Sequence, residues 1–401
     1  MTKLHAVDLI SMKTGATTRL EYSEAVLARS QARFIDRTVL APVQELDAFR
    51  CSAVVDWIEL EVDLRRKTQF QRVHAEIKEA IGQACWVKLL TSRATTSGTR
   101  FRVRFQQPTM VGLHAARIAL DAKFGIQSDP AVSSLEISVD FRPRTPLDAA
   151  RKTMVGLLVR HHLPDRDMLS TEDEMPRFRL GSRLLDGYVF PWSQSPNRRA
   201  INQALRRSNE GDRAAPVDGT FYIGKRDGPV MWRTMDKTID QQNRPSMTRV
   251  DLEAKECRAR IEVTLDRDEL DVLGIQTLSD FASFNFVTLQ RRYFKFMLPT
   301  FANCDLAPIG LQRTMRAYLE RERRTKFLTT GVLGLLAMDQ AILSEQTEIR
   351  RHEALRQTGN RMKQPTRVGG AVGTLIAYAR LNSKVETALR HLRDSVRSRG
   401  R

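Results

Sequence analysis

The stretch from Ala53 to Leu64 most strongly constrains the fold, because its side chains alternate in character. One phase is apolar, at Val54, Ile58, Leu60, Val62 and Leu64, and the other is polar or aromatic, at Trp57, Glu59, Glu61 and Asp63. Asp56 is the exception, since it falls in the apolar phase. A period of two residues is typical of a strand with one buried face. We therefore expect a half-buried strand here.

The segments that follow alternate between helical and strand patterns. Apolar residues recur at helical spacing over 68–82 and again over 109–124. Strand-like runs begin at Cys85 (CWVKLLTS) and at Thr99 (TRFRVRFQ), and SSLEISVDF forms a fourth over 133–141. The order β-α-β-β-α-β predicts an α+β fold with a ferredoxin-like antiparallel unit over 51–146 and both helices on one face.

In such a unit the fourth strand lies beside the first. The exposed phases of these two strands would bring five carboxylates together, those of Glu59, Glu61, Asp63, Glu136 and Asp140. Clustered carboxylates repel one another unless a cation or a basic neighbour compensates them. Oxygen ligands suit Mg²⁺ or Mn²⁺, so a metal site is one interpretation and a solvated sheet face is the other.

The remaining segments divide the chain further. We expect an N-terminal arm over 1–50 with a short helix from Ser23 to Arg33, a connection or insertion over 147–218, and a hairpin and strand region over 219–300. Residues 301–401 read as a basic helical domain, with helices over 311–327, 331–358 and 369–397. The break at GNRMKQPTRVGG loosely resembles the turn of a helix-turn-helix unit.

Charge indicates a polyanionic partner. The chain has 65 Lys and Arg against 47 Asp and Glu, a net charge of +18. More than half of this excess lies from Asp305 onward, with 19 basic and 9 acidic residues. Nucleic acid is the expected partner, and an anionic membrane surface comes second. Four dispersed cysteines and the absence of a long apolar run predict a cytoplasmic protein without a disulfide framework, zinc site or membrane span.

A predicted hairpin concentrates ionisable groups. Two apolar-rich runs in FYIGKRDGPVMWRTMDK (221–237) flank the pair Asp227-Gly228, which suits a tight turn and would place Tyr222 opposite Arg233. A further strand, RARIEVTL, covers 258–265, and DFASFNFVTLQRRYFKFM (280–297) is expected to be a helix.

The order of these runs resembles the Rep_trans-type replication initiation factors of rolling-circle plasmids, phages and integrative elements. That family has an aromatic-Ile-Gly strand, an Arg-x-Tyr-Asp-Lys strand and an Arg-hydrophobic-Glu strand. The resemblance implies a tyrosine nucleophile, an acidic Mg²⁺ or Mn²⁺ site, and binding of origin DNA as a single strand or cruciform. It also implies a host helicase and a homodimer as possible partners.

The chain departs from the family pattern at the nucleophile. Arg233-Thr234-Met235-Asp236-Lys237 stands where the family has Arg-x-Tyr-Asp-Lys, so Met235 replaces the tyrosine. Either nicking is lost, or the register differs, or another tyrosine acts. Tyr222 is the first substitute and Tyr293 the second, and the alternative for Tyr222 is a strand tyrosine packed in a sheet.

Other residues receive roles from the same interpretation. Arg233 and Lys237 would contact the scissile phosphate, and Glu262 would bind metal or pair with an arginine. The candidate DNA contacts are Arg258, Arg260, Arg291, Arg292, Lys295, Arg361, Lys363 and Arg367. Three classes of function follow: a nicking initiator, a catalytically silent origin-binding or regulatory protein, and an RNA-binding protein, for which Trp57 is the one exposed aromatic on the sheet.

Overall fold

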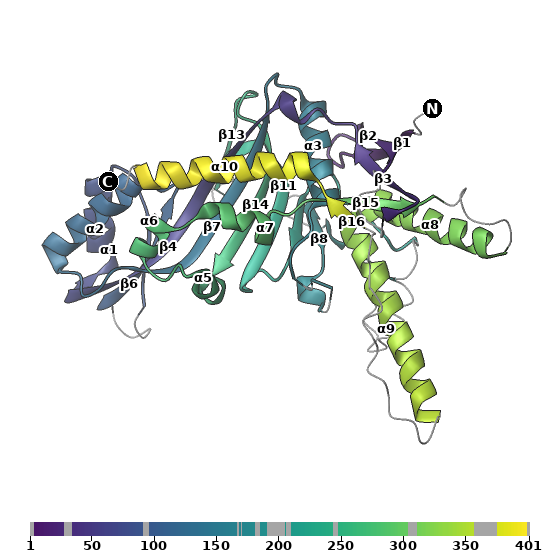
Figure 1. The fold of residues 1–401 in the computed structure, drawn as a ribbon. Helices are drawn as coiled ribbons and strands as arrows, with labels where there is room; N and C mark the ends of the chain where they lie inside the picture. The colour runs from purple at the N-terminus through teal and green to yellow at the C-terminus, as the bar shows by residue number, and fades with distance from the viewer. Residues whose placement is uncertain are drawn as a thin grey trace.

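The chain is built around a nine-stranded antiparallel sheet, seen in a computed structural model (Figure 1). The structure describes residues 4–27, 34–90, 96–166, 168–169, 171–180, 185–190, 205, 210–243, 248–303, 311–356 and 375–398. Within these ranges the strand order is β5-β6-β4-β7-β14-β11-β10-β8-β9. The strands are β4 (Phe49–Gln69), β5 (Trp86–Leu89), β6 (Ser97–Gln106), β7 (Ala131–Pro143), β8 (Arg177–Leu180), β9 (Leu185–Tyr188), β10 (Thr220–Ile223), β11 (Val230–Lys237) and β14 (Arg258–Asp266).

The half of the sheet around β4 follows the expected order of elements. The helix α1 (Phe70–Ile81) begins directly after β4, and α2 (Met110–Phe124) connects β6 to β7. Gly82 ends α1 with φ of 67°, a left-handed conformation that glycine adopts without strain. The strand β4 lies between β6 and β7, so the first and fourth strands of this segment are neighbours as expected.

The hairpin β10–β11 extends this sheet rather than forming another one. β14 pairs with β7, and β11 pairs with β14. Tyr222 lies opposite Arg233, which confirms the expected register. The tight turn expected at Asp227-Gly228 is wrong, because Gly228 N donates to Lys225 O (3.2 Å), which makes Arg226 and Asp227 the central residues, and neither Asp227 nor Gly228 has a positive φ. Gly224 has φ of 88°, and a Cβ there would lie 2.5 Å from Val230 O, so a side chain would not fit.

One face of the sheet is apolar and carries helices. Arg151 of α3 (Asp148–His161) pairs with Asp236 on this face, and Trp232 Nε1 donates to Tyr293 O of α7 (Leu289–Tyr293) at 2.8 Å. The helix α10 (Ala379–Ser398) buries Leu381 among its apolar residues and packs against β4, α7 and α6 (Leu278–Ser283). Figure 1 shows α10 crossing the strands. The other face carries the charged residues considered below.

The N-terminal segment contributes to a second, five-stranded sheet. Its order is β1-β2-β3-β15-β16, with β1 at Leu4–Ile10, β2 at Thr17–Val26, β3 at Arg37–Pro42, β15 at Met297–Ala302 and β16 at Leu375–Ala377. The helix expected from Ser23 is wrong up to Val26, because these residues pair with β3. The rest of that prediction, over 28–33, lies outside the described residues.

The single helix expected over Asp280–Met297 is also wrong. The segment contains α6, a single turn at Phe286–Thr288, α7 and the start of β15. Phe284 is extended, with φ of −62° and ψ of 143°, and its ring packs edge-on against Phe286. The backbone therefore leaves the helical conformation at Phe284, although the spacing of apolar residues predicts a continuous helix.

Two long helices and α10 make up most of the described C-terminal region. They are α8 (Leu311–Thr330) and α9 (Val332–Arg356), and α9 points away from the large sheet (Figure 1). The expected third helix begins later than predicted, because Leu375–Ala377 pairs with β15 as β16. The segment GNRMKQPTRVGG lies outside the described residues.

Shorter elements complete the described fold. They are α5 (Arg267–Leu273), the paired strands β12 (Ile239–Asn243) and β13 (Thr248–Asp251), and single-turn helices at Leu46–Ala48 and Glu172–Glu174. Among the described helices, none has the length and apolar character needed to cross a membrane.

Candidate metal and phosphate site

An irregularity in β4 sets the direction of Asp56. The register between β4 and β7 shifts at Asp56, because Val55 pairs with Ile137 whereas Trp57 pairs with Glu136. An extra residue of this kind is a β-bulge, and it resets the alternation of side chains. Asp56 therefore lies on the polar face with Trp57. An aspartate in an apolar phase is the sequence signal for such a shift, because an unpaired carboxylate in the core is costly.

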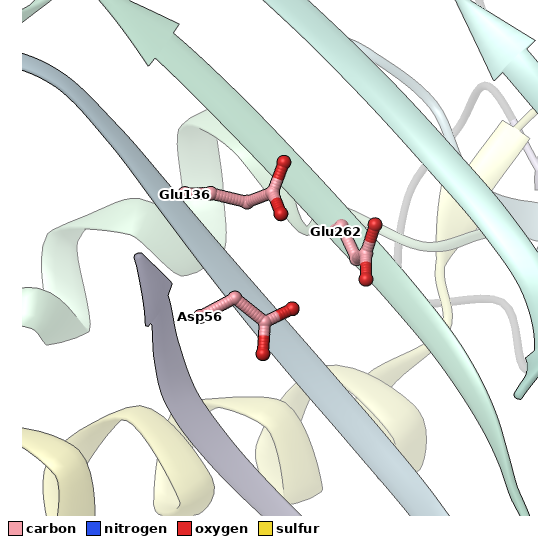
Figure 2. A group of neighbouring side chains, drawn as sticks. All are labelled: Asp56, Glu136 and Glu262. Atoms are coloured by element: carbon pink, nitrogen blue, oxygen red, sulfur yellow. The ribbon is translucent and has the colours of Figure 1, made fainter. Parts of the chain in front are cut away.

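Three carboxylates converge at the centre of the polar face. Asp56 from β4, Glu136 from β7 and Glu262 from β14 point toward one another (Figure 2). Their oxygen atoms lie within 4.8 Å of one another, and Glu136 and Glu262 are buried. We call these three residues the acidic triad. The triad could hold a metal ion, since carboxylate oxygens are the preferred ligands of hard divalent cations.

Two arginines already contact the acidic triad. Arg260 donates to Asp56 Oδ2 at 2.6 Å and to Glu262 Oε1 at 3.2 Å. Arg233 Nη2 lies 2.5 Å from Glu136 Oε2 and 2.7 Å from Glu262 Oε2. The second contact is not aligned as a hydrogen bond, so Glu262 Oε2 is a buried acceptor without a hydrogen-bond partner. An oxygen in this state is suited to accept a cation.

The other predicted carboxylates have separate partners. Asp140 is fully buried and receives two hydrogen bonds from Arg260, at 2.5 and 2.8 Å. The remaining three face β6 in a ladder of ion pairs, Glu59 with Arg104, Glu61 with Arg102 and Asp63 with Arg100. The structure therefore brings Glu136 and Glu262 next to Asp56, whose place in the alternating pattern predicted a side chain that faces the core.

Burial and charge act differently on two members of the triad. Burial raises the pKa of the Glu262 carboxyl to about 7, with Arg233 acting in the opposite direction and Glu136 adding to the rise. Burial also acts to raise the pKa of Asp56, but Arg260 and Ser138 outweigh it and hold this pKa below its ordinary value. Glu262 therefore carries a proton at a pH where Asp56 is ionised.

Because the pKa of Glu262 is raised and that of Asp56 is lowered, the two carboxyl groups make the stability of the fold depend on pH in opposite directions. The pKa of Glu262 is about 7 when folded and about 4.5 when unfolded, so its contribution to stability is full below pH 4.5 and is lost as pH rises through 7. We expect the free energy of unfolding of the wild type, relative to Glu262→Gln, to fall between pH 5 and pH 8. The decrease should reach about 1.4 kcal/mol per pH unit at most.

Urea denaturation at several pH values measures this decrease. Asp280→Asn is the control, because hydrogen bonds from Thr277 hold the pKa of Asp280 below its ordinary value and confine its titration to more acidic conditions. The difference between wild type and Asp280→Asn should stay constant from pH 5 to pH 8. A constant difference for Glu262→Gln as well would contradict the raised pKa.

A pocket rich in arginine lies beside the triad and contains Tyr222. Its volume is about 210 Å³, and its lining is Arg177, Phe178, Arg179, Tyr222, Arg226, Met231 and Arg233. The Arg177 guanidinium lies over the Tyr222 ring, 5.6 Å from its centroid. No carboxylate is among these lining residues. We call this the arginine pocket, and its charge suits a phosphate group.

Pairing across the strands links the pocket to the triad. Tyr222 pairs with Arg233, and Arg233 pairs with Glu262. Because adjacent strands are about 4.8 Å apart, the backbones at Tyr222 and Glu262 are about 10 Å apart. Glu262 and Glu136 raise the pKa of Arg233, although burial lowers it. Arg233 is therefore a fixed cation between the tyrosine and the acidic triad.

The other predicted catalytic positions are less favourable. Tyr293 is buried on the helical side and its hydroxyl donates to Glu269, which together with burial raises the pKa of the phenol strongly. Met235 pairs with Arg260, so it occupies the polar face. Lys237 lies on the same face at the end of β11, where burial and Arg260 lower its pKa.

Most of the residues predicted to contact DNA either pair with a carboxylate or lie outside the described residues. Arg258 and Arg260 are buried and pair with Asp140. Arg292 lies 2.7 Å from Glu269, whereas Arg291 is exposed and Lys295 is half-buried. The predicted contacts Arg361, Lys363 and Arg367 lie outside the described residues. Sequence reasoning missed Arg177 and Arg179, because β8 is far from the hairpin in the chain and only pairing with β10 brings it close. It also missed Arg226, which lies in the turn of the predicted hairpin itself.

No protein-family model matches the chain, and neither does any curated protein. The resemblance to rolling-circle initiators therefore stays a hypothesis. What the site can do chemically follows from its own side chains: an arginine pocket that suits phosphate, a tyrosine inside it, and an acidic triad that could hold a metal ion.

Proposed function

We propose that the chain is a replication initiation protein of a rolling-circle element, which binds origin DNA and nicks one strand with Tyr222 as the nucleophile. The position of Tyr222 in the arginine pocket, two strands from the acidic triad, carries this proposal. The unit formed by β4, α1, β5, β6, α2 and β7 is, on this proposal, the ferredoxin-like core of the initiator.

Each group around Tyr222 has a physical task in strand cleavage. Arg177, Arg179 and Arg226 would bind the scissile phosphodiester through charge-assisted hydrogen bonds. The Tyr222 oxygen would lose its proton to solvent and form a bond to phosphorus, while the bond from phosphorus to the 3′ oxygen breaks. The leaving 3′ oxygen takes a proton, and the 5′ phosphate remains attached to Tyr222. Arg233 would stabilise the negative charge that develops on the phosphoryl oxygens.

The acidic triad would hold Mg²⁺ or Mn²⁺. Glu262 Oε2, which has an ion pair with Arg233 but no aligned hydrogen bond, and the short separations between the carboxylates fit a hard cation. A bound divalent ion supplies Lewis-acid polarisation of phosphate oxygens. To make room for it, Arg260 would release Asp56 and Glu262 and retain its paired hydrogen bonds to Asp140, and Arg233 would release Glu136 and Glu262.

A nicking assay tests the proposal. Purified protein is incubated with supercoiled plasmid that carries the origin of the encoding element, with Mg²⁺, with Mn²⁺ or with a chelator. We expect nicked circles and a covalent 5′ protein–DNA adduct with either metal and neither with the chelator. Intact supercoiled plasmid under all of these conditions, despite binding of the same DNA, would count against nicking.

Met235 favours a second candidate function. With methionine at the family's tyrosine position, the same polar face would serve a catalytically silent origin-binding or regulatory protein. This candidate predicts DNA binding that weakens steeply with salt, because basic residues release counterions from the phosphates, and no adduct with any metal. Preferential binding of RNA over DNA would instead favour the RNA-binding class, for which the polar face offers Trp57 and Trp86 on either side of Arg104.

A further inference from the structure

A second pocket lies at the opposite side of the acidic triad, around the outer edge of β4. Its volume is about 490 Å³, within the range of about 300–1,000 Å³ that is typical of small-molecule sites. It extends to Asp140 and Arg142 of β7 and to Arg258 and Arg260 of β14, whereas the lining of the arginine pocket begins at the next strand, β11. It lies between the Ser52–Asp56 segment, the start of α2 and the C-terminal half of α10. We call it the edge pocket.

One end of the edge pocket is cationic. Arg142 and Arg258 line it, and the Nε atom of each is buried without a hydrogen-bond partner. Arg142 Nη1 donates to Ser52 Oγ at 3.1 Å, and its Nε lies 3.5 Å from the half-exposed Glu256. Two carboxylates line the pocket, Asp56 and Asp140; Arg260 binds both, and Arg258 Nε lies 3.0 Å from Asp140 Oδ2. Three lining guanidinium groups therefore face two lining carboxylates, which leaves an excess of one positive charge.

The other end of the pocket combines apolar walls with polar backbone. Met110, Phe281 and Val396 are among its apolar lining residues. Strand β6 pairs with β4 only from Trp57 onward, so the described strands leave the outer edge of β4 before Asp56 without a partner. Its backbone donors and acceptors are therefore available to a flat polar ring. The first turn of α2 also faces this pocket, and its N–H groups favour an anion.

We propose that the edge pocket binds a nucleotide. Arg142 and Arg258 would bind its phosphate, and the base would lie between the apolar walls with its polar edge toward β4. The nucleotide could be free or could be the end of a DNA strand, since the chemistry of recognition is the same. The proposal does not depend on cleavage by Tyr222, because the two pockets share no lining residue.

Calorimetric titration of the full chain with dAMP tests this site. We expect one saturable site per chain, with deoxyadenosine and inorganic phosphate each bound at least about tenfold more weakly, because each lacks one half of the ligand. Arg142→Gln should weaken dAMP at least tenfold. Arg390→Gln is the matched control, since Arg390 lies on α10, pairs with Glu386 and does not line the pocket. Ser395→Trp fills the pocket without removing a charge and should also abolish binding.

The remaining outcomes separate the sources of the nucleotide and the failures of the proposal. Competition by a 5′-phosphorylated single-stranded oligonucleotide would assign the site to a DNA end, and dAMP binding without such competition would assign it to a free nucleotide. Absence of saturable dAMP binding, or equal affinity in Arg142→Gln, Ser395→Trp and the control, overturns the proposal. Tyr222→Phe should bind dAMP as the wild type does. Failure of the nicking proposal can therefore be distinguished from failure of the nucleotide site.

Discussion

Tyr222→Phe should lose nicking activity by about 10³-fold or more, because phenylalanine has no oxygen to form the bond to phosphorus. The ring and its stacking with Arg177 remain, so binding of origin DNA should stay close to that of the wild type. Conversion of supercoiled plasmid to nicked circles measures the activity. A denaturing gel detects the covalent protein–DNA adduct, which should be absent.

A second tyrosine provides the control for this variant. Tyr318 lies on α8, is 39% exposed and is not among the residues of either pocket. Tyr318→Phe should nick at the wild-type rate. If Tyr222→Phe nicks as fast as Tyr318→Phe and still forms the adduct, Tyr222 is not the nucleophile. If neither variant nor the wild type nicks while all three bind DNA, the catalytically silent function is favoured.

Arg260→Met should destabilise the fold by about 3–5 kcal/mol, which is the usual effect of removing one partner of a buried ion pair. Arg260 is 3% exposed and binds Asp140, Asp56 and Glu262, and Asp140 is fully buried. Methionine keeps much of the volume but leaves these carboxylates without their shared cation. The midpoint of urea denaturation, with an unchanged slope, measures the loss.

Arg102→Met is the matched control for this variant. Arg102 pairs with Glu61 on the same face, but its side chain is 35% exposed, so solvent weakens the interaction. We expect a loss of about 1 kcal/mol or less for it. Equal losses for Arg260→Met and Arg102→Met would contradict the central role of Arg260.

Local patterns predicted much of the large sheet. The alternation of Glu59 and Glu61 with Leu60 placed the first strand and its buried face, and the Asp227-Gly228 pair gave a hairpin whose register, Tyr222 opposite Arg233, is confirmed. The strands and the register are confirmed because the strand period depends on neighbouring residues, whereas the turn itself is centred on Arg226-Asp227 and not on Asp227-Gly228. The helix over 280–297 failed because burial of Phe281, Phe286 and Phe294 in the core overrides the local preference.

The candidate site was predictable only in part. Glu136, Glu262, Arg233 and Tyr222 were all singled out from their strands, and pairing brings them to one face. Asp56 was assigned to the core phase, because strict alternation cannot anticipate a bulge. The ladder of Arg100, Arg102 and Arg104 was also missed as the counterpart of Glu59, Glu61 and Asp63. Opposite charges across two strands become neighbours only when the register is known.

The sequence by itself determined most strands of the large sheet, the charged character of one of its faces and the hairpin that carries Tyr222. Tertiary structure decided which of those charges meet. It joined β14 to β7, which brought Glu262 to Glu136, and it placed β8 beside β10, which added Arg177 and Arg179 to the pocket around Tyr222. The physical reason is that local patterns set the direction of a side chain, whereas the pairing of strands distant in the chain sets its neighbours.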